Sequence, residues 1–151
     1  MVVKDLGKHI SPQARGKRGR SETRTVAGVK YALIDPRKVR DYVLSIAEKE
    51  WDPEDFEKFG EDLRQAKWRL RIVRVQDIKA QPALMRSEEF LRDLRPRIEA
   101  VSKRITERKP IPPLILERDS LVFDGYARLH ALKDSGVKKC LAYVGVRRSH
   151  E

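Results

Sequence analysis

Residues 121–132 read Leu-Val-Phe-Asp-Gly-Tyr-Ala-Arg-Leu-His-Ala-Leu, and this stretch decides the expected fold. Its first three residues are typical of a strand, Asp124 and Gly125 end that strand, and residues 127–133 have the apolar spacing of a helix. A strand that turns through a glycine into a helix presents free N–H groups and the positive end of the helix dipole. We therefore expect an anion in front of Gly125, with Arg128 adding a forked, charged contact. The alternative is a plain helix start with an Asp124–Arg128 ion pair at i, i+4.

The segments around this stretch complete a mixed α+β domain. Residues 112–117 are an apolar run that a turn separates from the strand at 121–123, which predicts a β-hairpin. Ser87 is placed to cap a long amphipathic helix, which we expect Pro96 to kink or split. Two further segments have the composition of strands, one beginning at Leu70 and one spanning residues 139–146.

Residues 31–69 are expected to form a helical hairpin that packs on the following domain. Both helices begin with Asp-Pro, at Asp35 and Asp52, where the Asp side chain caps the helix and the missing proline N–H costs nothing. Aromatic side chains in this region would suit a platform that stacks on bases, but their helical spacing favours core positions: Trp51, Phe56, Phe59 and Trp68.

Residues 1–30 are expected to form a flexible basic arm. The segment holds eight Lys and Arg residues against two acidic residues, and it has almost no periodic apolar residues. We expect several of its cations to contact the phosphate backbone of nucleic acid: Arg15, Lys17, Arg18, Arg20 and Arg24. The alternative is a tail that only keeps the protein in solution.

The composition limits the class of partner. The 151 residues include 34 Lys and Arg against 23 Asp and Glu, a net charge of +11, which points to polyanions such as nucleic acid or nucleotide phosphates. Cys140 is the single cysteine, which excludes an internal disulfide, and the histidines have no zinc-ligand spacing. No apolar run approaches the ~18 residues that cross a bilayer, and the basic N-terminus lacks the apolar stretch of a signal peptide. We expect a cytoplasmic protein without membrane contact.

Residues 70–146 resemble the ParB/sulfiredoxin superfamily in the order of their elements and in one short box. The box is G-x-x-R-x-x-A, and its three fixed positions are matched by Gly125, Arg128 and Ala131. Gln81-Pro82 stands where partition proteins have a Q-P-R box, with Ala83 in place of the arginine. The resemblance implies an α+β fold in which a small mixed sheet is packed with helices.

The branches of this superfamily imply different chemistry. Sulfiredoxins carry a reactive cysteine directly after the glycine, and Tyr126 stands there in this chain, so the resemblance excludes a sulfinic-acid reductase. Partition-type ParB domains hold the triphosphate of CTP with a G-E-R-R-like box. This chain keeps its Gly125 and Arg128 and has Tyr126, Ala127 and His130 where that branch has Glu, Arg and often Arg. This branch implies a nucleotide, as ATP, ADP or CTP with Mg²⁺, held by residues of the box: Gly125, Tyr126, Arg128 and His130.

The free serine kinases of the superfamily carry Asp-Gly-His-His-Arg, of which Asp124, Gly125 and Arg128 are kept and both histidines are lost. Those kinases take a base from the start of the preceding helix. The resemblance therefore implies Glu88 or Glu89 as the catalytic base and Asp124 as a catalytic, magnesium-binding carboxylate.

These observations predict a ParB-like protein that binds nucleotide and DNA, with a phosphate pocket at Gly125 and a basic arm. DNA binding is expected to be largely independent of sequence, because no helix-turn-helix is recognisable after residue 146. A homodimer is compatible with this interpretation. Two alternatives stay open, a small-molecule phosphotransferase and a non-catalytic adaptor, so the sequence does not decide whether the chain is an enzyme.

Overall fold

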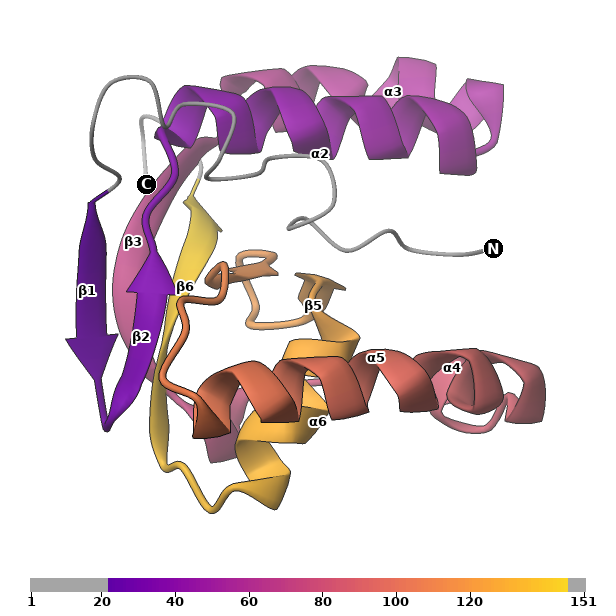
Figure 1. Cartoon of the computed structure of the whole chain (residues 1–151). Helices are drawn as coiled ribbons and strands as arrows, with labels where there is room; N and C mark the ends of the chain where they lie inside the picture. Colours follow the sequence, from indigo (N-terminus) through magenta and orange to yellow (C-terminus); the bar gives the residue numbers. More distant parts are fainter. Residues whose placement is uncertain (1–21, 147–151) are drawn as a thin grey trace.

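A computed structural model describes residues 22–146 and shows a mixed α+β fold, as expected (Figure 1). Its helices and strands are, in chain order, β1 (Thr23–Val26), β2 (Val29–Ala32), α2 (Pro36–Glu50), α3 (Pro53–Gln65), β3 (Lys67–Arg74), the 3-10 turn η2 (Val75–Asp77), α4 (Pro82–Met85), α5 (Glu88–Thr106), β4 (Leu114–Leu116), β5 (Val122–Asp124), α6 (Tyr126–Asp134) and β6 (Lys139–Val146).

The main sheet has the strand order β3-β6-β4-β5. Strand β6 pairs antiparallel with β3, from Lys67 opposite Val146 to Arg74 opposite Lys139, and it pairs parallel with β4. Strands β4 and β5 pair antiparallel, which confirms the hairpin predicted from the two apolar runs. Strand β3 therefore lies at one edge of this sheet and β5 at the other.

Helices cover the sheet on both faces because neighbouring side chains of a strand point to opposite sides. Ile115 and Tyr143 pack with residues of α2, whereas their neighbours on β4 and β6 pack with residues of α5 and α6. Figure 1 shows α2 and α3 together on one side and α4, α5 and α6 on the other. Burying each large apolar side chain contributes about 1.5–3 kcal/mol, so both helix layers hold the sheet.

Helices α2 and α3 begin where the two Asp-Pro pairs predict. Asp35 accepts a hydrogen bond from the Arg37 N–H at 2.9 Å, and this bond lowers the pKa of the Asp35 carboxyl. Just before α2, the Tyr143 hydroxyl accepts from the Ile34 N–H at 2.8 Å and donates to the Ile34 carbonyl. This pair of bonds ties the helical segment to the central strand β6.

The aromatic residues of this region confirm the core interpretation only in part. Trp68 is 5% exposed, and its ring lies so close to Gly145 that a Cβ there would be 2.9 Å from ring carbons. Phe59, in contrast, is 45% exposed. Trp68 is therefore a core residue and no stacking platform.

The prediction of a flexible arm over residues 1–30 is wrong for residues 23–30. Residues 23–32 form the hairpin β1–β2, with Thr23 opposite Ala32. Ala27 and Gly28 both have positive φ, 52° and 83°, as a tight hairpin turn requires. Arg24 is therefore on a strand, whereas Arg15, Lys17, Arg18 and Arg20 lie outside the described residues.

Helix α5 runs from Glu88 to Thr106 without a break, so Pro96 does not split it. Leu94 and Val101, on either side of Pro96, are both buried against the core. This packing holds the two halves in one helix although the proline removes a backbone donor. None of the helices within residues 22–146 has the length and apolar character needed to cross a membrane.

Cys140 is expected to be unreactive in the folded protein. Its side chain is fully buried in β6, and burial raises the pKa of the thiol to about 12. Since the thiolate is the reactive form, Ellman's reagent at about pH 8 should label no thiol in the native protein and one thiol in urea. Rapid labelling of the native protein would contradict this packing.

Candidate functional site

The turn at Gly125 has the backbone shape that the sequence predicts. Gly125 precedes α6 with φ 119° and ψ 28°, a conformation that residues with a Cβ rarely adopt. A Cβ built there would lie 2.5 Å from Leu114 Cδ2 and 2.9 Å from Arg128 Nη2. The glycine is therefore required by the backbone and by two neighbouring side chains.

Arg128 is buried, with 1% of its surface exposed. Its Nη2 donates to Asp124 Oδ2 at 3.0 Å, and its Nη1 donates to the carbonyls of Pro112 and Pro113 at 3.2 and 3.1 Å. The structure thus contains the i, i+4 ion pair that the sequence left open as an alternative. In this conformation the guanidinium is bonded to protein acceptors and packs against Gly125.

This geometry explains the spacing of Gly125 and Arg128 within the chain. The arginine side chain folds back over one helical turn to the glycine, where a Cβ would collide with the guanidinium. The same guanidinium serves the carbonyls of the segment that leads into β4. The glycine and the arginine together fasten the α6 start to the β4 start.

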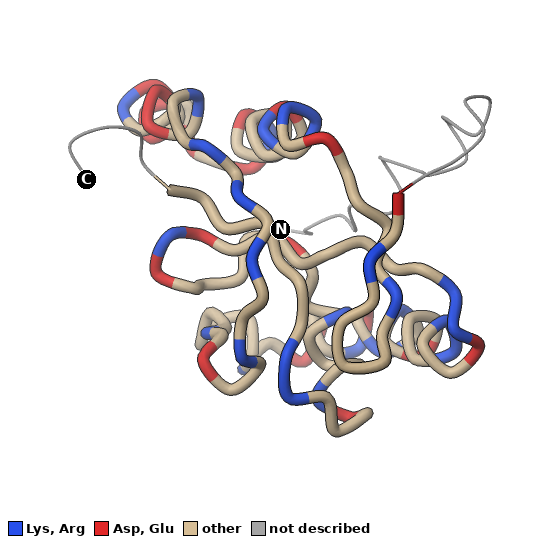
Figure 2. Tube along the Cα trace, turned by 90° about the vertical axis from the view of Figure 1, so that its left-hand side faces the viewer, with Lys and Arg blue, Asp and Glu red and all other residues tan. Residues whose placement is uncertain are grey.

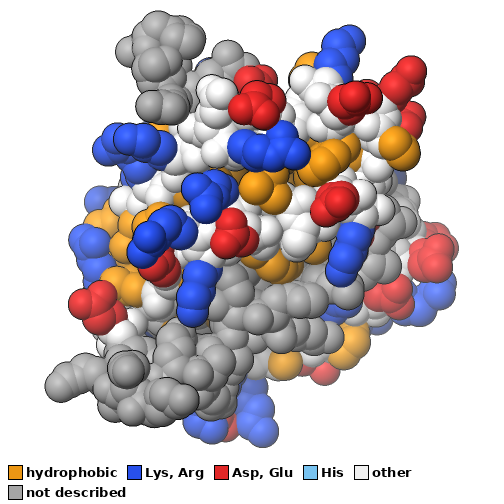
Figure 3. Space-filling view, turned by 90° about the horizontal axis from the view of Figure 1, so that it is seen from above, with side chains coloured by type: hydrophobic (Ala, Val, Ile, Leu, Met, Phe, Trp, Pro, Cys, Tyr) orange, Lys and Arg blue, Asp and Glu red, His pale blue; other side chains and the backbone are white. Residues whose placement is uncertain are grey.

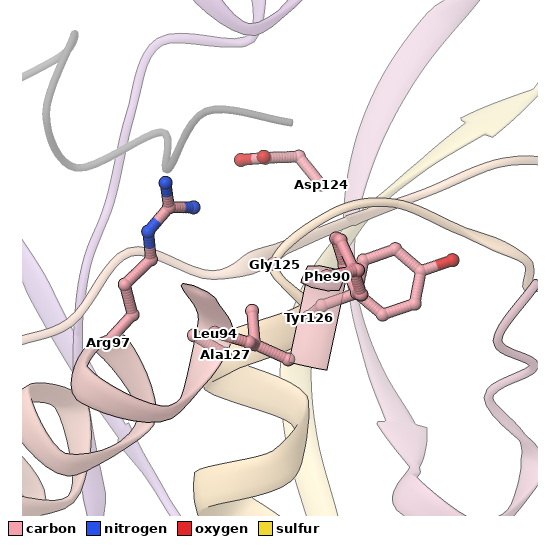
Figure 4. Close-up of a pocket in the computed structure, with 7 residues that line it drawn as sticks. All are labelled: Phe90, Leu94, Arg97, Asp124, Gly125, Tyr126 and Ala127. Atoms are coloured by element: carbon pink, nitrogen blue, oxygen red, sulfur yellow. The ribbon is translucent and has the colours of Figure 1, made fainter. Parts of the chain in front are cut away.

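The hollow in front of Gly125 is small. It lies between α5 and the start of α6, with Leu94, Arg97 and Asp124 among its walls (Figure 4). Its volume is about 10 Å³, roughly the space of one water molecule, whereas sites for small molecules take about 300 Å³ or more. The expected nucleotide contact by Gly125, Tyr126, Arg128 and His130 therefore remains a prediction that this geometry does not favour.

Tyr126 belongs to the core beside this turn. It is 4% exposed, its ring meets Phe90 edge to face at 5.5 Å, and its hydroxyl accepts from the Gln81 N–H at 3.0 Å. Burial raises the pKa of the phenol. The hydrogen bond joins Gln81-Pro82 to the start of α6, so the two matched segments of the sequence meet in space.

His130 is half-buried on α6, and burial together with the charge of Lys133 lowers the pKa of its imidazole. Its expected role as a nucleotide contact remains a prediction.

The residues expected for phosphoryl transfer are not brought into one pocket. Glu88 and Glu89 are exposed in the first turn of α5, whereas Asp124 is 1% exposed and paired with Arg128. Within residues 22–146, no cluster of three acidic, histidine or cysteine side chains is placed to hold a metal ion. The catalytic and magnesium-binding roles therefore remain predictions.

The structure reveals a basic surface that the sequence analysis missed. Strands β1, β2, β3 and β6 contain seven charged residues, and all seven are basic and exposed. We call this set the basic strand face: Arg24, Lys30, Lys67, Arg69, Arg71, Arg74 and Lys139. On β3 the side chains alternate, so Lys67, Arg69 and Arg71 point to one side of the sheet, whereas Arg74 and its ladder partner Lys139 point to the other. In Figure 2, Lys and Arg mark the strands that face the viewer. The sequence signal for this surface was the alternation of basic and apolar residues from Lys67 to Arg71.

Most of these cations have no carboxylate partner among the described residues. Arg74 is the exception, because its Nε lies 3.1 Å from Asp77 Oδ2. The helices α2 and α3 differ, since they hold eight acidic residues against six basic ones, and Figure 3 shows both signs mixed on that side. The four strands therefore carry a net charge of +7, whereas α2 and α3 together carry −2.

Aromatic side chains on the same strands are buried. Tyr31, Trp68 and Tyr143 are 0%, 5% and 2% exposed. The basic strand face consequently offers cations and no aromatic ring on which a base could stack. Such a surface suits the phosphate backbone of a nucleic acid.

No protein family and no curated protein matches the chain. Among solved structures, the chain is similar to a pNOB8-like ParB-N domain, with 23% identity and a TM-score of 0.43 over 56% of this chain and 32% of that one. A second structure of a pNOB8-like ParB N-domain has 26% identity and a TM-score of 0.42, over 56% of this chain and 30% of the other. The chain is thus similar to ParB N-domain structures over about half of its own length, and it spans about a third of theirs.

Proposed function

We propose that the protein binds nucleic acid by contacting phosphates with the basic strand face. The observation that carries this proposal is that every charged residue of β1, β2, β3 and β6 is basic and exposed. Each Lys or Arg that neutralises a phosphate releases a condensed counterion, and this release provides affinity at low salt. The binding is electrostatic, so it weakens as salt rises.

The same features make duplex DNA of any sequence the expected partner. Contacts to phosphates position a protein on a duplex but do not read its bases. Stacking on single-stranded bases needs exposed rings, and the rings of these strands are buried. Residues 1–21 add six Lys and Arg residues against one acidic residue, which adds to the attraction without adding sequence preference.

Removing two neighbouring charges of β3 tests this proposal. Arg69→Gln combined with Arg71→Gln should make the slope of log K against log salt shallower by about 1.8 units, because each contact with duplex DNA contributes about −0.9. Both side chains are exposed, so the fold should be unchanged. The measurement is fluorescence anisotropy of a labelled duplex titrated at several salt concentrations.

Arg92→Gln combined with Arg95→Gln is the matched control, since it removes two exposed arginines of α5. This control lowers the net charge by the same amount and should leave the slope nearly unchanged. Equal slopes for the two double variants would show that general charge attracts DNA and would refute the strand face as its binding surface.

Neither nucleotide binding nor phosphotransfer gains comparable support. Arg128 is bonded to Asp124 and to two carbonyls, and the hollow at Gly125 has a volume of about 10 Å³. The proposal is therefore a binding protein whose contacts are made by the strands.

A further inference from the structure

A groove lies at the end of β3, where the chain leaves the sheet through η2 and the turn between α6 and β6 passes close by. Its volume is about 560 Å³, within the range of ligand sites in proteins, about 300–1,000 Å³. Four cationic side chains line it: Arg74, Lys133, Lys138 and Lys139. No acidic residue is among the lining residues, so the lining carries four positive charges and no negative one.

Two of these cations lie directly beside each other on neighbouring strands. Arg74 and Lys139 are direct partners in the antiparallel ladder of β3 and β6. Like charges directly opposite each other destabilise a strand pair. Asp77 bonds to Arg74 at 3.1 Å, and both side chains are more than half exposed, so solvent screens this attraction as well as the repulsion from Lys139. An anion bound between Arg74 and Lys139 would offset their repulsion.

Three of the backbone donors around the groove are already used. The N–H groups of Gly136 and Val137 bond to carbonyls of α6 at 3.0 and 3.1 Å, and the Val75 N–H bonds to the Lys138 carbonyl at 2.9 Å. The charged donors of the groove are the ends of long, separate side chains. Such side chains suit an anion with several charged oxygens spread over more than one group.

We infer that this groove binds phosphate groups, either those of a free oligophosphate or successive phosphates of a nucleic-acid backbone. The chemistry is the same in both cases, because lysine and arginine donate charge-assisted hydrogen bonds to phosphate oxygens. The groove also adjoins the basic strand face, since Arg74 and Lys139 belong to both. The oligophosphate case does not depend on the proposed function.

Lys133→Gln combined with Lys138→Gln tests the inference without changing any residue of the strand face. Both side chains are exposed, so the fold should tolerate the change. Calorimetric titration of the full chain with inorganic tripolyphosphate should show at least about tenfold weaker binding, since two charge-assisted contacts are lost. The slope of the salt dependence for duplex DNA should fall by about 1.8 units if backbone phosphates enter the groove.

The matched control is Lys38→Gln combined with Lys49→Gln, on α2. Lys49 lies in the last turn of its helix, as Lys133 does in α6, and Figure 1 shows α2 at the end of the molecule opposite the α6–β6 turn. The control should change tripolyphosphate affinity less than about twofold, because the charges are remote and screened.

The outcomes separate the sources of phosphate. Weaker binding of tripolyphosphate alone assigns the groove to free oligophosphates, and a shallower DNA slope assigns it to the backbone. If the groove variant matches its control in both measurements, the inference is wrong. Failure of the Arg69 and Arg71 variant to change the DNA slope would refute the strand face while leaving the groove result standing.

Discussion

Replacing Arg128 with alanine is expected to lower the free energy of unfolding by about 3–5 kcal/mol, the usual cost of breaking a buried ion pair by removing one partner. Arg128 and Asp124 are each 1% exposed and lie 3.0 Å apart. The substitution removes a buried cation beside a buried carboxylate. It also removes the hydrogen bonds that Arg128 donates to the carbonyls of Pro112 and Pro113.

The measurement is urea denaturation followed by tryptophan fluorescence. Arg64→Ala is the control, because Arg64 pairs with Glu61 at 3.1 Å at the surface, with side chains 51% and 63% exposed, and such pairs contribute less than about 1 kcal/mol. Combining Arg128→Ala with Asp124→Asn should recover part of the loss, since the carboxylate charge is removed as well. A loss for Arg128→Ala no larger than for Arg64→Ala would mean that the guanidinium faces solvent.

The starts of helices could be predicted because their signals are local. Asp35 and Asp52 cap their helices within two residues of themselves, so the Asp-Pro pairs carry the information directly. The last strand, 139–146, matched its apolar run in the same way.

The sequence offered two roles for Arg128 but could not decide between them, because the outcome depends on a distant part of the chain. An arginine in the first turn of a helix can reach outward to an anion or back toward the preceding strand, and the spacing Gly-x-x-Arg is the same for both. The carbonyls that hold it belong to Pro112 and Pro113, 16 and 15 residues away. Only the fold brings these acceptors within reach of Arg128.

The basic strand face could not be predicted from the sequence for a similar reason. The charges of residues 22–30 were attributed to an arm, but Val26, Val29 and Tyr31 are buried in the core, and Tyr31 forms a bridge with Ile111. The arginines of β3 marked a strand, yet their exposure follows from the position of β3 at the sheet edge. Strand order is set by long-range pairing, which local patterns do not report.

Replacing Gly125 with alanine is expected to lower the free energy of unfolding by about 2–5 kcal/mol. The positive φ of 119° costs a residue with a Cβ roughly 1–2 kcal/mol. The new methyl group would also lie 2.5 Å from Leu114 Cδ2 and 2.9 Å from Arg128 Nη2, and forcing extra atoms into a packed site costs about 1–3 kcal/mol. Urea denaturation measures the total loss in the free energy of unfolding.

Gly136→Ala separates the two contributions. Gly136 also has a positive φ, 75°, but nothing lies within 4 Å of the position its Cβ would take. This variant should therefore lose only the backbone cost, about 1–2 kcal/mol. The excess loss of Gly125→Ala over Gly136→Ala measures how tightly Leu114 and the Arg128 guanidinium close on the turn. If both variants lost the same free energy, the guanidinium would have room to move away from Gly125, and the space in front of α6 could then open to a phosphate.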